Sequence, residues 1–410
     1  MVRELERKRQ SAKFPETAPA ANPVFFRTYS RRTKAGLRET WDEVCDRTLM
    51  GLVELGKLTQ EEAAILDRMQ RNLKAMPSGR WLWVGGTDWI NKPKNFSGAY
   101  NCTSTNLEDW SAFGLMMDLA MMGCGTGAVL EPQFINKLPP IRNRLNITVQ
   151  GEIGNTPVQK RREYTETHIE GNSVTIHVGD SREGWVESYQ RLLELSTDEQ
   201  FSTEVEVLVD ISDVRKAGET LNGFGGVANP VKLPGLYQRC ASILNKARGR
   251  QLNSIESCLL IDQAAVTIVA GNIRRSAGMR QGSSEDSLFA DAKDNLWQQD
   301  ESGNWRIDPQ RDALRMANHT RVFHRKPTLE ECLNAVRKQY LSGEGAIQWA
   351  GEAVARSNID LLPTPNLKIE FLKAYEQGTA KQWLKERYPN LDANELEHRL
   401  QRYALNPCGN

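Results

Sequence analysis

The sequence has no Cys-x-x-Cys pair, although its 410 residues include seven cysteines. Scattered single cysteines argue against a zinc knuckle and against a secreted disulfide framework, so any redox pair has to be brought together by folding. Histidine is also scarce, and neither His319 nor His324 has a further ligand at a metal-binding spacing such as His-x-x-x-His. We therefore expect no protein-bound metal.

The sequence also lacks a charge excess and a long apolar run. Lysine plus arginine number 53 against 52 aspartates plus glutamates, so the net charge is +1 and no field favours nucleic acid or a membrane surface. No run approaches the ~18 to 20 apolar residues of a membrane span, and the basic N-terminus lacks the apolar stretch of a secretory signal. These absences predict a cytoplasmic protein without nucleic-acid or membrane partners.

Three regions follow one another along the chain. Residues 1–25 are polar and rich in proline and alanine, which is typical of a mobile lead-in. In residues 26–76, apolar residues recur at helical spacing from Leu37 to Leu73, which predicts two or three helices. Residues 77–410 alternate short β-branched runs with helical segments, which indicates an α/β fold. The 39% hydrophobic content is enough for one large domain with an insertion.

Hydrophobic periodicity predicts individual elements within the third region. Aromatic and β-branched runs predict strands at 81–84, 206–210 and 265–269. Apolar residues at helical spacing predict helices at 109–122, 235–246 and 328–341. The acidic stretch 283–308 is predicted to be a solvated loop, and the charged stretch 367–402 to form surface helices.

Five segments carry more specific information, namely Asn95–Ser104, Met122–Gly127, Asp210–Gly226, Val269–Ala277 and Tyr403–Asn410. In this order they resemble segments of the adenosylcobalamin-dependent (class II) ribonucleotide reductases. The counterparts there are the strand with the first redox cysteine, a glycine-rich turn, the specificity loop, a core segment and the active-site loop. The resemblance runs from about Met76 to Asn410 and is closest to the monomeric ribonucleoside-triphosphate reductases.

The resemblance also implies the fold. The family has a ten-stranded α/β barrel, of which this chain would hold the first part, over residues 77–410. Residues 26–76 would form an N-terminal helical region, and an insertion at 132–208 would contribute an effector-binding subdomain. Because only about 75 residues precede the strand region of Cys102, there is little room for a separate effector-binding cone, so a single allosteric site is expected.

Three residues are assigned catalytic roles by the resemblance. Cys408 lies in the motif Asn406-Pro407-Cys408 and would become the thiyl radical that removes the 3′-hydrogen of the ribose. Asn406 would hydrogen-bond the substrate. Cys102 would reduce the 2′ carbon and end in a disulfide with a cysteine absent from this chain, to be restored by a thioredoxin-like dithiol. Asn410 stands where the family has the glutamate base, and a neutral amide cannot act as that base.

Effector binding is expected around a helix start and the loop that resembles the specificity loop. Asp180 or Ser181 is well placed to cap a helix that runs to Leu195, which is a sufficient structural role; a helix N-terminus is also a binding site for phosphate. Glycines would give the loop the freedom to switch between arrangements when a deoxynucleotide or ATP effector binds. The predicted effector and specificity residues are Asp180, Ser181, Arg215, Lys216, Gly218, Gly223, Gly225 and Gly226.

The end of the sequence leaves alternatives open. Cys408 could be the authentic radical cysteine of a chain interrupted by truncation or an intron. It could also be the first residue of an intein, since inteins commonly begin with cysteine and favour active-site motifs. The expected function is cobalamin-dependent reduction of ribonucleoside triphosphates, which needs the missing C-terminal half, so the isolated chain is expected to be inactive. The alternative is a nucleotide-binding fragment without catalysis. The residues do not decide between diphosphate and triphosphate substrates.

Overall fold

The computed structural model describes residues 14–33, 35–219, 228–268 and 277–407. These residues divide into two compact units, with the boundary at Asn101. The described part of unit 1 is residues 14–33 and 35–101, and that of unit 2 is residues 102–219, 228–268 and 277–407. None of the helices in these ranges is long and apolar enough to cross a membrane.

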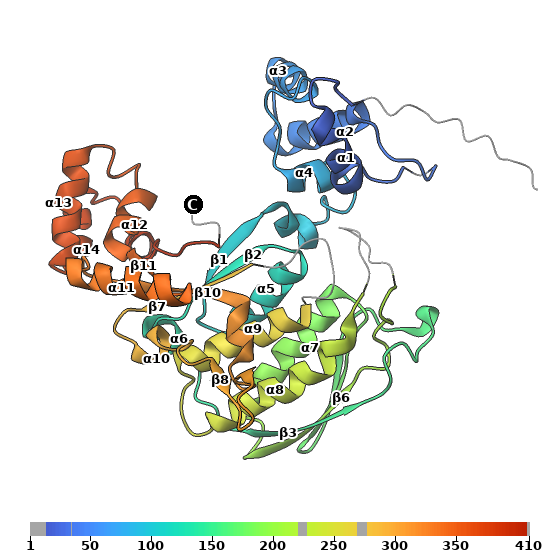
Figure 1. Ribbon diagram of the computed structural model, residues 1–410, viewed down its shortest axis with the longest axis vertical. Helices are drawn as coiled ribbons and strands as arrows, with labels where there is room; N and C mark the ends of the chain where they lie inside the picture. Colours follow the sequence, from blue (N-terminus) through green and yellow to red (C-terminus); the bar gives the residue numbers. More distant parts are fainter. Residues whose placement is uncertain (1–13, 34, 220–227, 269–276, 408–410) are drawn as a thin grey trace, which may run out of the picture. The chain divides into compact units, whose positions relative to one another are not determined.

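Unit 1 is helical (Figure 1). Thr40 and Glu43 form a capping box at the start of its longest helix, and Trp41, Val44 and Cys45 of that helix are buried. The prediction of two or three helices between Leu37 and Leu73 is confirmed by α2 and α3. The predicted strand at 81–84 is wrong, because Ser78 caps a helical turn there and buries Trp81 and Leu82. The helices are α1 (Asn22–Val24), α2 (Trp41–Gly56), α3 (Gln60–Arg71) and α4 (Gly79–Val84).

Unit 2 is built around a five-stranded sheet in which every described pair of strands is parallel, in the order β1-β2-β7-β10-β11. The prediction of an α/β fold is confirmed. Five described strands pair in this sheet, whereas the resemblance implies ten in a complete barrel. The strands are β1 (Cys102–Asn106), β2 (Gly125–Val129), β7 (Gly278–Ser283), β10 (Ala317–Phe323) and β11 (Ala346–Trp349).

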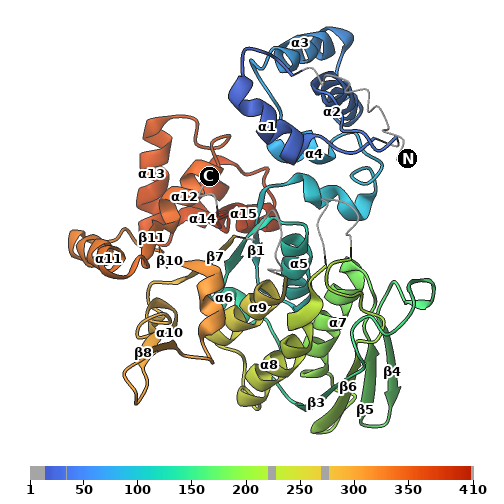
Figure 2. The ribbon, with the colours of Figure 1, turned by 45° about the vertical axis from the view of Figure 1, so that its right-hand side comes forward.

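Helices connect and cover these strands (Figures 1 and 2). Asp109 caps α5, and this helix buries Met116 and Met117, which confirms the predicted helix at 109–122. The predicted strand at 265–269 is wrong, because residues 265–268 continue the apolar, almost wholly buried helix α9. The elements are α5 (Trp110–Met121), α6 (Pro132–Ile135), α9 (Ser254–Ile268), α10 (Ser287–Ala290), α11 (Leu329–Ser342), α12 (Ala350–Ser357), α13 (Pro365–Glu376), α14 (Ala380–Arg387) and α15 (Ala393–Leu400).

A second sheet of four strands lies between β2 and β7 in sequence, in the order β3-β6-β5-β4. Its β6 confirms the strand predicted at 206–210, and α8 confirms the helix predicted at 235–246. The predicted loop at 283–308 is only partly irregular, since it contains α10 and a small hairpin. These elements are β3 (Arg144–Gln150), β4 (Glu166–Glu170), β5 (Ser173–His177), α7 (Arg182–Leu195), β6 (Glu204–Asp210), α8 (Leu233–Lys246), β8 (Trp297–Gln299) and β9 (Trp305–Ile307).

Candidate functional site

Cys102 shares one face of the five-stranded sheet with two glycines and two glutamines. In parallel pairing, residues in register point to the same face, and positions two apart on one strand share that face. The register of Cys102 with Gly125, and the pairings that continue through β7 and β10, therefore put one set of residues on this face. We call it the Cys102 face; it includes Cys102, Gly125, Gly127, Gln281 and Gln348.

The C-terminal segment 403–407 lies on the Cys102 face and is held by the two glutamines. The amide N–H of Leu405 donates to Oε1 of Gln281 at 2.7 Å. Nε2 of Gln348 donates to the carbonyl of Tyr403 at 2.6 Å, and Gln281 also donates to Gln348. Both glutamine side chains are buried, so these hydrogen bonds satisfy polar groups that would otherwise be costly.

The glycines of β2 allow the segment to come this close. A Cβ atom built on Gly127 would lie 2.4 Å from the carbonyl oxygen of Leu405. A Cβ on Gly125 would lie 2.9 Å from Sγ of Cys102 and 3.2 Å from Cγ of Pro407. Cys102 and Pro407 therefore border the same small space above Gly125. Both Cys102 and Asn406 are partly buried.

A buried carboxylate anchors the segment at the other end of the sheet, where β2 and β10 finish. Tyr403 donates from its hydroxyl to Glu131, which is only 2% exposed. Nε2 of His324 lies 2.8 Å from Oε1 of Glu131, and Gln133 donates to the Tyr403 hydroxyl at 2.6 Å. The hydrogen bond with Glu131 raises the pKa of His324. Burial, together with the nearby Glu131 charge, raises the pKa of Tyr403.

The opposite face of the sheet carries a different set of polar groups. Arg280 and Asp262 are both fully buried, and Nη2 of Arg280 donates to Oδ1 of Asp262 at 2.7 Å. Cys258 donates from its thiol to Oδ2 of Asp262 at 3.2 Å, and its sulfur lies 3.7 Å from Nε2 of His319. Burial raises the pKa of Cys258 and lowers that of His319, so the thiol and imidazole are neutral.

Cys258, Asp262 and His319 offer three ligand atoms within 4.8 Å of one another, a grouping that histidine and cysteine spacing did not predict. Cys258 and Asp262 are four residues apart on α9, whereas His319 lies on β10, so no short sequence spacing connects the three. Asp262 already accepts two hydrogen bonds from the guanidinium of Arg280. The charge of that guanidinium opposes a metal cation at the same carboxylate. The cluster is therefore best explained as a buried hydrogen-bond network.

The predicted effector residues Asp180, Ser181 and Arg215 come together at the start of α7. Ser181 caps the helix by accepting the N–H of Gly184 at 2.9 Å, as its position predicted. Oδ1 of Asp180 accepts both the backbone N–H and Nε of Arg215, at 2.9 and 2.8 Å. The segment that begins at Arg215 is thus attached directly to the helix start.

Two further charged residues, which the sequence did not single out, complete this network. Arg161 forms two hydrogen bonds with Glu219, at 2.8 and 2.9 Å, and a third with Asp180 at 3.2 Å. The Arg161 bonds lower the pKa of Glu219 to about 2. The backbone N–H of Lys216 also donates to Glu219, and Gly218 has a φ of +91°. Gly223, Gly225, Gly226 and Cys408 lie outside the described residues.

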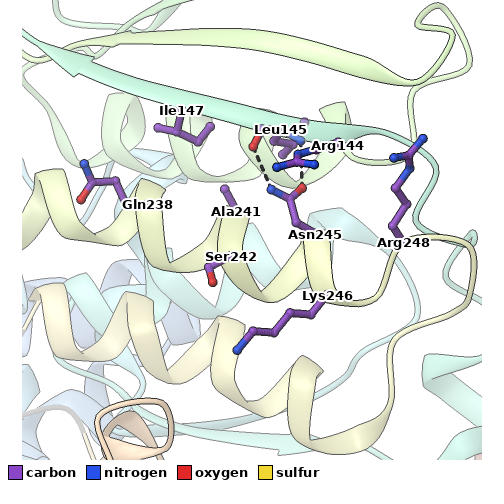
Figure 3. Close-up of a pocket in the computed structure, with 9 residues that line it drawn as sticks. All are labelled: Arg144, Leu145, Ile147, Gln238, Ala241, Ser242, Asn245, Lys246 and Arg248. Atoms are coloured by element: carbon purple, nitrogen blue, oxygen red, sulfur yellow. Dashed lines mark hydrogen bonds between the residues drawn. The ribbon is translucent and has the colours of Figure 1, made fainter.

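Two cavities lie away from the Cys102 face. One, of about 550 Å³, lies between β3 and α8 and contains none of the predicted site residues. Figure 3 shows Asn245 of α8 turned toward β3, where its amide binds both backbone groups of Leu145 at 2.8 and 2.9 Å. The other, of about 420 Å³, is lined by His319, Arg321 and Lys338 among others.

Comparisons with known proteins agree with this architecture. The family model for the B12-dependent ribonucleotide reductase insertion domain matches residues 150–241. The adenosylcobalamin-dependent ribonucleoside-triphosphate reductase of Lactobacillus helveticus is 27% identical over 319 residues, and that of Lacticaseibacillus paracasei is 28% identical over 320. Each match covers 66% of this chain and 42% of the relative. The chain thus spans well under half the length of these relatives.

A crystal structure of a B12-dependent (class II) ribonucleotide reductase shares the fold, with a TM-score of 0.60 and 22% sequence identity. The match covers 77% of this chain and 47% of that chain. The described residues form an α/β protein in which segment 403–407 lies against the sheet face that carries Cys102. The chain is thus similar to the B12-dependent, class II ribonucleotide reductases in sequence, and it shares their fold.

Proposed function

We propose that this chain takes part in reducing ribonucleoside triphosphates to 2′-deoxyribonucleotides by thiyl-radical chemistry. The observation that carries the proposal is that Cys102 and Pro407 border the same small space above Gly125 on one sheet face. Pro407 is bonded to Cys408, and consecutive Cα atoms are about 3.8 Å apart. The proposed radical residue is therefore the sequence neighbour of a residue that borders the proposed reductant.

In the proposed reaction, the Cys408 thiyl takes the 3′-hydrogen of the ribose as an atom. A sulfur radical suits this step because its S–H bond is similar in strength to the sugar C–H bond, which makes the step reversible. The 2′-hydroxyl then leaves as water. Cys102 and a second thiol supply two electrons and two protons: one proton leaves in the water, the other goes to the 2′ carbon, and the two sulfurs become a disulfide. Cys408 then returns its hydrogen atom to the 3′ carbon and is a thiyl radical again, while Asn406 binds the substrate by hydrogen bonds. The base for the 3′-hydroxyl has to come from a residue other than the neutral Asn410.

Adenosylcobalamin is the proposed cofactor, since the names of the relatives state this dependence for those proteins. Neither described cavity fits it: pockets of about 300 to 1,000 Å³ hold drug-sized ligands, and a corrin with its axial groups is larger than these. We therefore assign no residue of this chain to the cofactor and derive no step through it. The proposed chemistry of this chain begins at the thiyl radical.

The second sheet and the start of α7 are the proposed site for a deoxynucleotide or ATP effector. Three observations support it: the insertion-domain match at residues 150–241, the cluster of Asp180 with Arg215 and Arg161, and the helix N-terminus at Ser181. In this proposal the loop after Arg215 passes effector identity on to the substrate site. It would include Lys216, Gly218, Gly223, Gly225 and Gly226.

The remaining proposals concern organisation and partners. We propose a lead-in at residues 1–25, a helical region at 26–76 and an effector-binding insertion within 132–208. A thioredoxin-like dithiol would restore Cys102, and the rest of the reductase would supply the second redox cysteine. A nucleotide-binding part without catalysis is the alternative, and it is favoured by the ion-pair network around Asp180, which stands apart from the Cys102 face.

The experiment compares Cys102→Ser with Cys332→Ser in a reductase that joins this chain to the remaining region. With adenosylcobalamin, a ribonucleoside triphosphate and a dithiol, we expect Cys102→Ser to keep its thermal midpoint and effector binding but to lose multiple turnover. Cys332→Ser, which changes a partly buried thiol on α11, should remain active. Turnover by Cys102→Ser at the parent rate would show that Cys102 only packs. The 410-residue chain alone should show no turnover.

A further inference from the structure

The cavity of about 420 Å³ lies on the face of the five-stranded sheet opposite to the Cys102 face. Two of its residues, His319 and Arg321, are two positions apart on β10 and so share a face. Thr320, between them, is in register with Gln281 of the Cys102 face. Further lining residues come from α10, β8 and α11, which lie close to β10 in Figure 2. The cavity is therefore separate from the proposed reaction site.

The carboxylates of this cavity already have lysine partners. Oε1 of Glu344 lies 2.6 Å from Nζ of Lys293, whose side chain is only 9% exposed. Oδ1 of Asp294 lies 3.0 Å from Nζ of Lys338. Each of these pairs is neutral as a whole. They leave the cavity with the positive charges of its two arginines.

Neither arginine has a carboxylate partner in the described part of the chain. Nε of Arg315 donates to the backbone carbonyl of Asp312 at 3.2 Å, and the Asp312 carboxylate pairs instead with Arg239 at 3.1 Å. Arg321 donates from Nη2 to the carbonyl of Gly345 at 3.4 Å, whereas its Nε is buried without an acceptor among the described residues. Because a buried N–H without an acceptor is costly, a bound acceptor at this position would stabilise the structure.

Trp297 adds a flat apolar surface to the same cavity. It is the first residue of β8 and is 52% exposed. The guanidinium carbon of Arg315 lies 6.0 Å from the centroid of its ring. An exposed indole stacks with planar rings such as those of nucleotide bases. The volume of the cavity also falls within the range of about 300 to 1,000 Å³ that is typical of small-molecule sites.

The charge and the aromatic wall together define the ligand chemistry. Planar guanidinium groups bind phosphate oxygens through paired N–H donors, and a dianionic phosphate matches the charge of two arginines. We propose that this cavity binds a nucleotide, with Arg315 and Arg321 on the phosphate and Trp297 stacked on the base. The site goes beyond the proposed function, since neither the chemistry at Cys102 nor the effector network around Asp180 uses these residues.

The test uses the 410-residue chain with fluorotryptophan in place of tryptophan. Fluorine NMR follows the resonance of Trp297, which is assigned by its loss in Trp297→Phe. Titration with ADP should shift this resonance saturably, whereas that of Trp305, exposed on β9 and outside the cavity lining, should stay in place. Because the readout is local, ADP bound elsewhere on the chain does not enter it. A Trp297 resonance that stays unshifted up to about 10 mM ADP would overturn the proposal.

Charge variants test the phosphate contact. Arg321→Gln removes the buried donor and should weaken ADP binding at least tenfold, as read at Trp297. Arg356→Gln is the matched control, because it removes an arginine of α12 whose side chain is 74% exposed and outside the cavity lining, and it should bind ADP like the parent. Equal affinities of Arg321→Gln and the parent would contradict the proposal. If circular dichroism shows that Arg321→Gln is unfolded, Arg315→Gln, at an exposed position, is judged by the same criterion.

Two further ligands separate the phosphate contact from the stacking contact. Pyrophosphate carries phosphate without a ring, and adenosine carries the ring without phosphate. We expect ADP to bind at least tenfold more tightly than adenosine and severalfold more tightly than pyrophosphate. Equal binding of ADP and pyrophosphate would overturn the nucleotide assignment, because the site would then take inorganic phosphate alone. Equal binding of ADP and adenosine would overturn the role of the arginines. None of these measurements uses turnover, so their outcome is independent of the Cys102→Ser test.

Discussion

The two faces of the five-stranded sheet are covered in different ways. On the Cys102 face, β2 has glycines at positions 125 and 127, and a segment of backbone lies against them through hydrogen bonds from two glutamines. On the other face, helix α9 packs directly on the strands, and a fully buried pair of Arg280 and Asp262 joins helix to sheet. One face accommodates a loop, whereas the other secures the scaffold.

The difference indicates where stability and where chemistry reside. Neutral hydrogen bonds contribute about 0.5 to 1.5 kcal/mol each, so a loop held by a few of them can be displaced without unfolding the sheet. A buried ion pair that loses one partner leaves an uncompensated charge, which costs several times more. Substitutions on the two faces should therefore separate loop position from global stability.

The largest effect is expected from Asp262→Ala. It leaves the Arg280 guanidinium buried without its carboxylate, so we expect a loss of about 3–5 kcal/mol in the free energy of unfolding, measured by urea titration. Asp262→Leu combined with Arg280→Met is the control: it removes both charges and should recover most of the loss. A loss below about 1 kcal/mol in Asp262→Ala would show that the pair does not secure this face.

Gly127→Ala should disturb the Cys102 face by a smaller amount. The new methyl group would lie 2.4 Å from the Leu405 carbonyl, so the segment must move, at a cost of about 1–3 kcal/mol. Limited proteolysis should then cut near Leu405 faster than in the parent. Gly235→Ala, where a Cβ meets nothing within 4 Å, is the control and should leave cleavage unchanged. Equal protection of Leu405 in both variants would refute the docking of the segment.

Gln281→Ala tests the hydrogen bonds that hold the segment. It removes the acceptor of the Leu405 N–H and should cost about 1 kcal/mol. Hydrogen exchange should become severalfold faster at Leu405 while the amides of β7 keep their protection. If β7 and Leu405 lose protection together, the glutamine supports the sheet and not the loop.

The smallest effect concerns pH. Because Glu131 raises the pKa of His324, their ion pair stabilises the folded protein fully below about pH 6.5, and this contribution disappears as the pH rises through the raised pKa. His324 is partly exposed, so the contribution should stay under about 1 kcal/mol. His324→Gln should unfold at a lower urea concentration than the parent at pH 6, and the gap should narrow as the pH rises. If the difference in unfolding urea concentration between the variant and the parent grows as the pH rises, the pKa of His324 is not raised by Glu131.

Short-range sequence patterns were enough to predict some features of unit 2. The Ser181 cap and the helix at 109–122 follow from short-range patterns. The motif resemblance implies that Cys102 and Asn406 belong to one site, and this stays a prediction. The roles of Gln281, Gln348 and Glu131 had no such signal, because their partners lie 55 to 272 residues away along the chain. A single glutamine in a strand has no spacing that indicates its contact.

In both wrong strand predictions, the structural context outweighed the local strand propensity. Residues 265–268 are rich in β-branched and apolar side chains, and such a run is compatible with a buried strand or a buried helix. Tertiary packing stabilises the helix in this segment, because α9 is buried on nearly all sides. At 81–84 the Ser78 cap outweighed the β-propensity of the tryptophans.

The most direct test of the central claim is a thiol cross-link between Cys102 and Cys408 in the 410-residue chain. A short bifunctional thiol reagent, followed by peptide mass spectrometry, should give the Cys102–Cys408 pair as the main product, because Pro407 already borders the Cys102 sulfur across Gly125. Cys332, partly buried on α11, serves as the control and should not link to either. If Cys408 reacts singly while Cys102 links elsewhere or not at all, the two residues do not share a site and the account is contradicted.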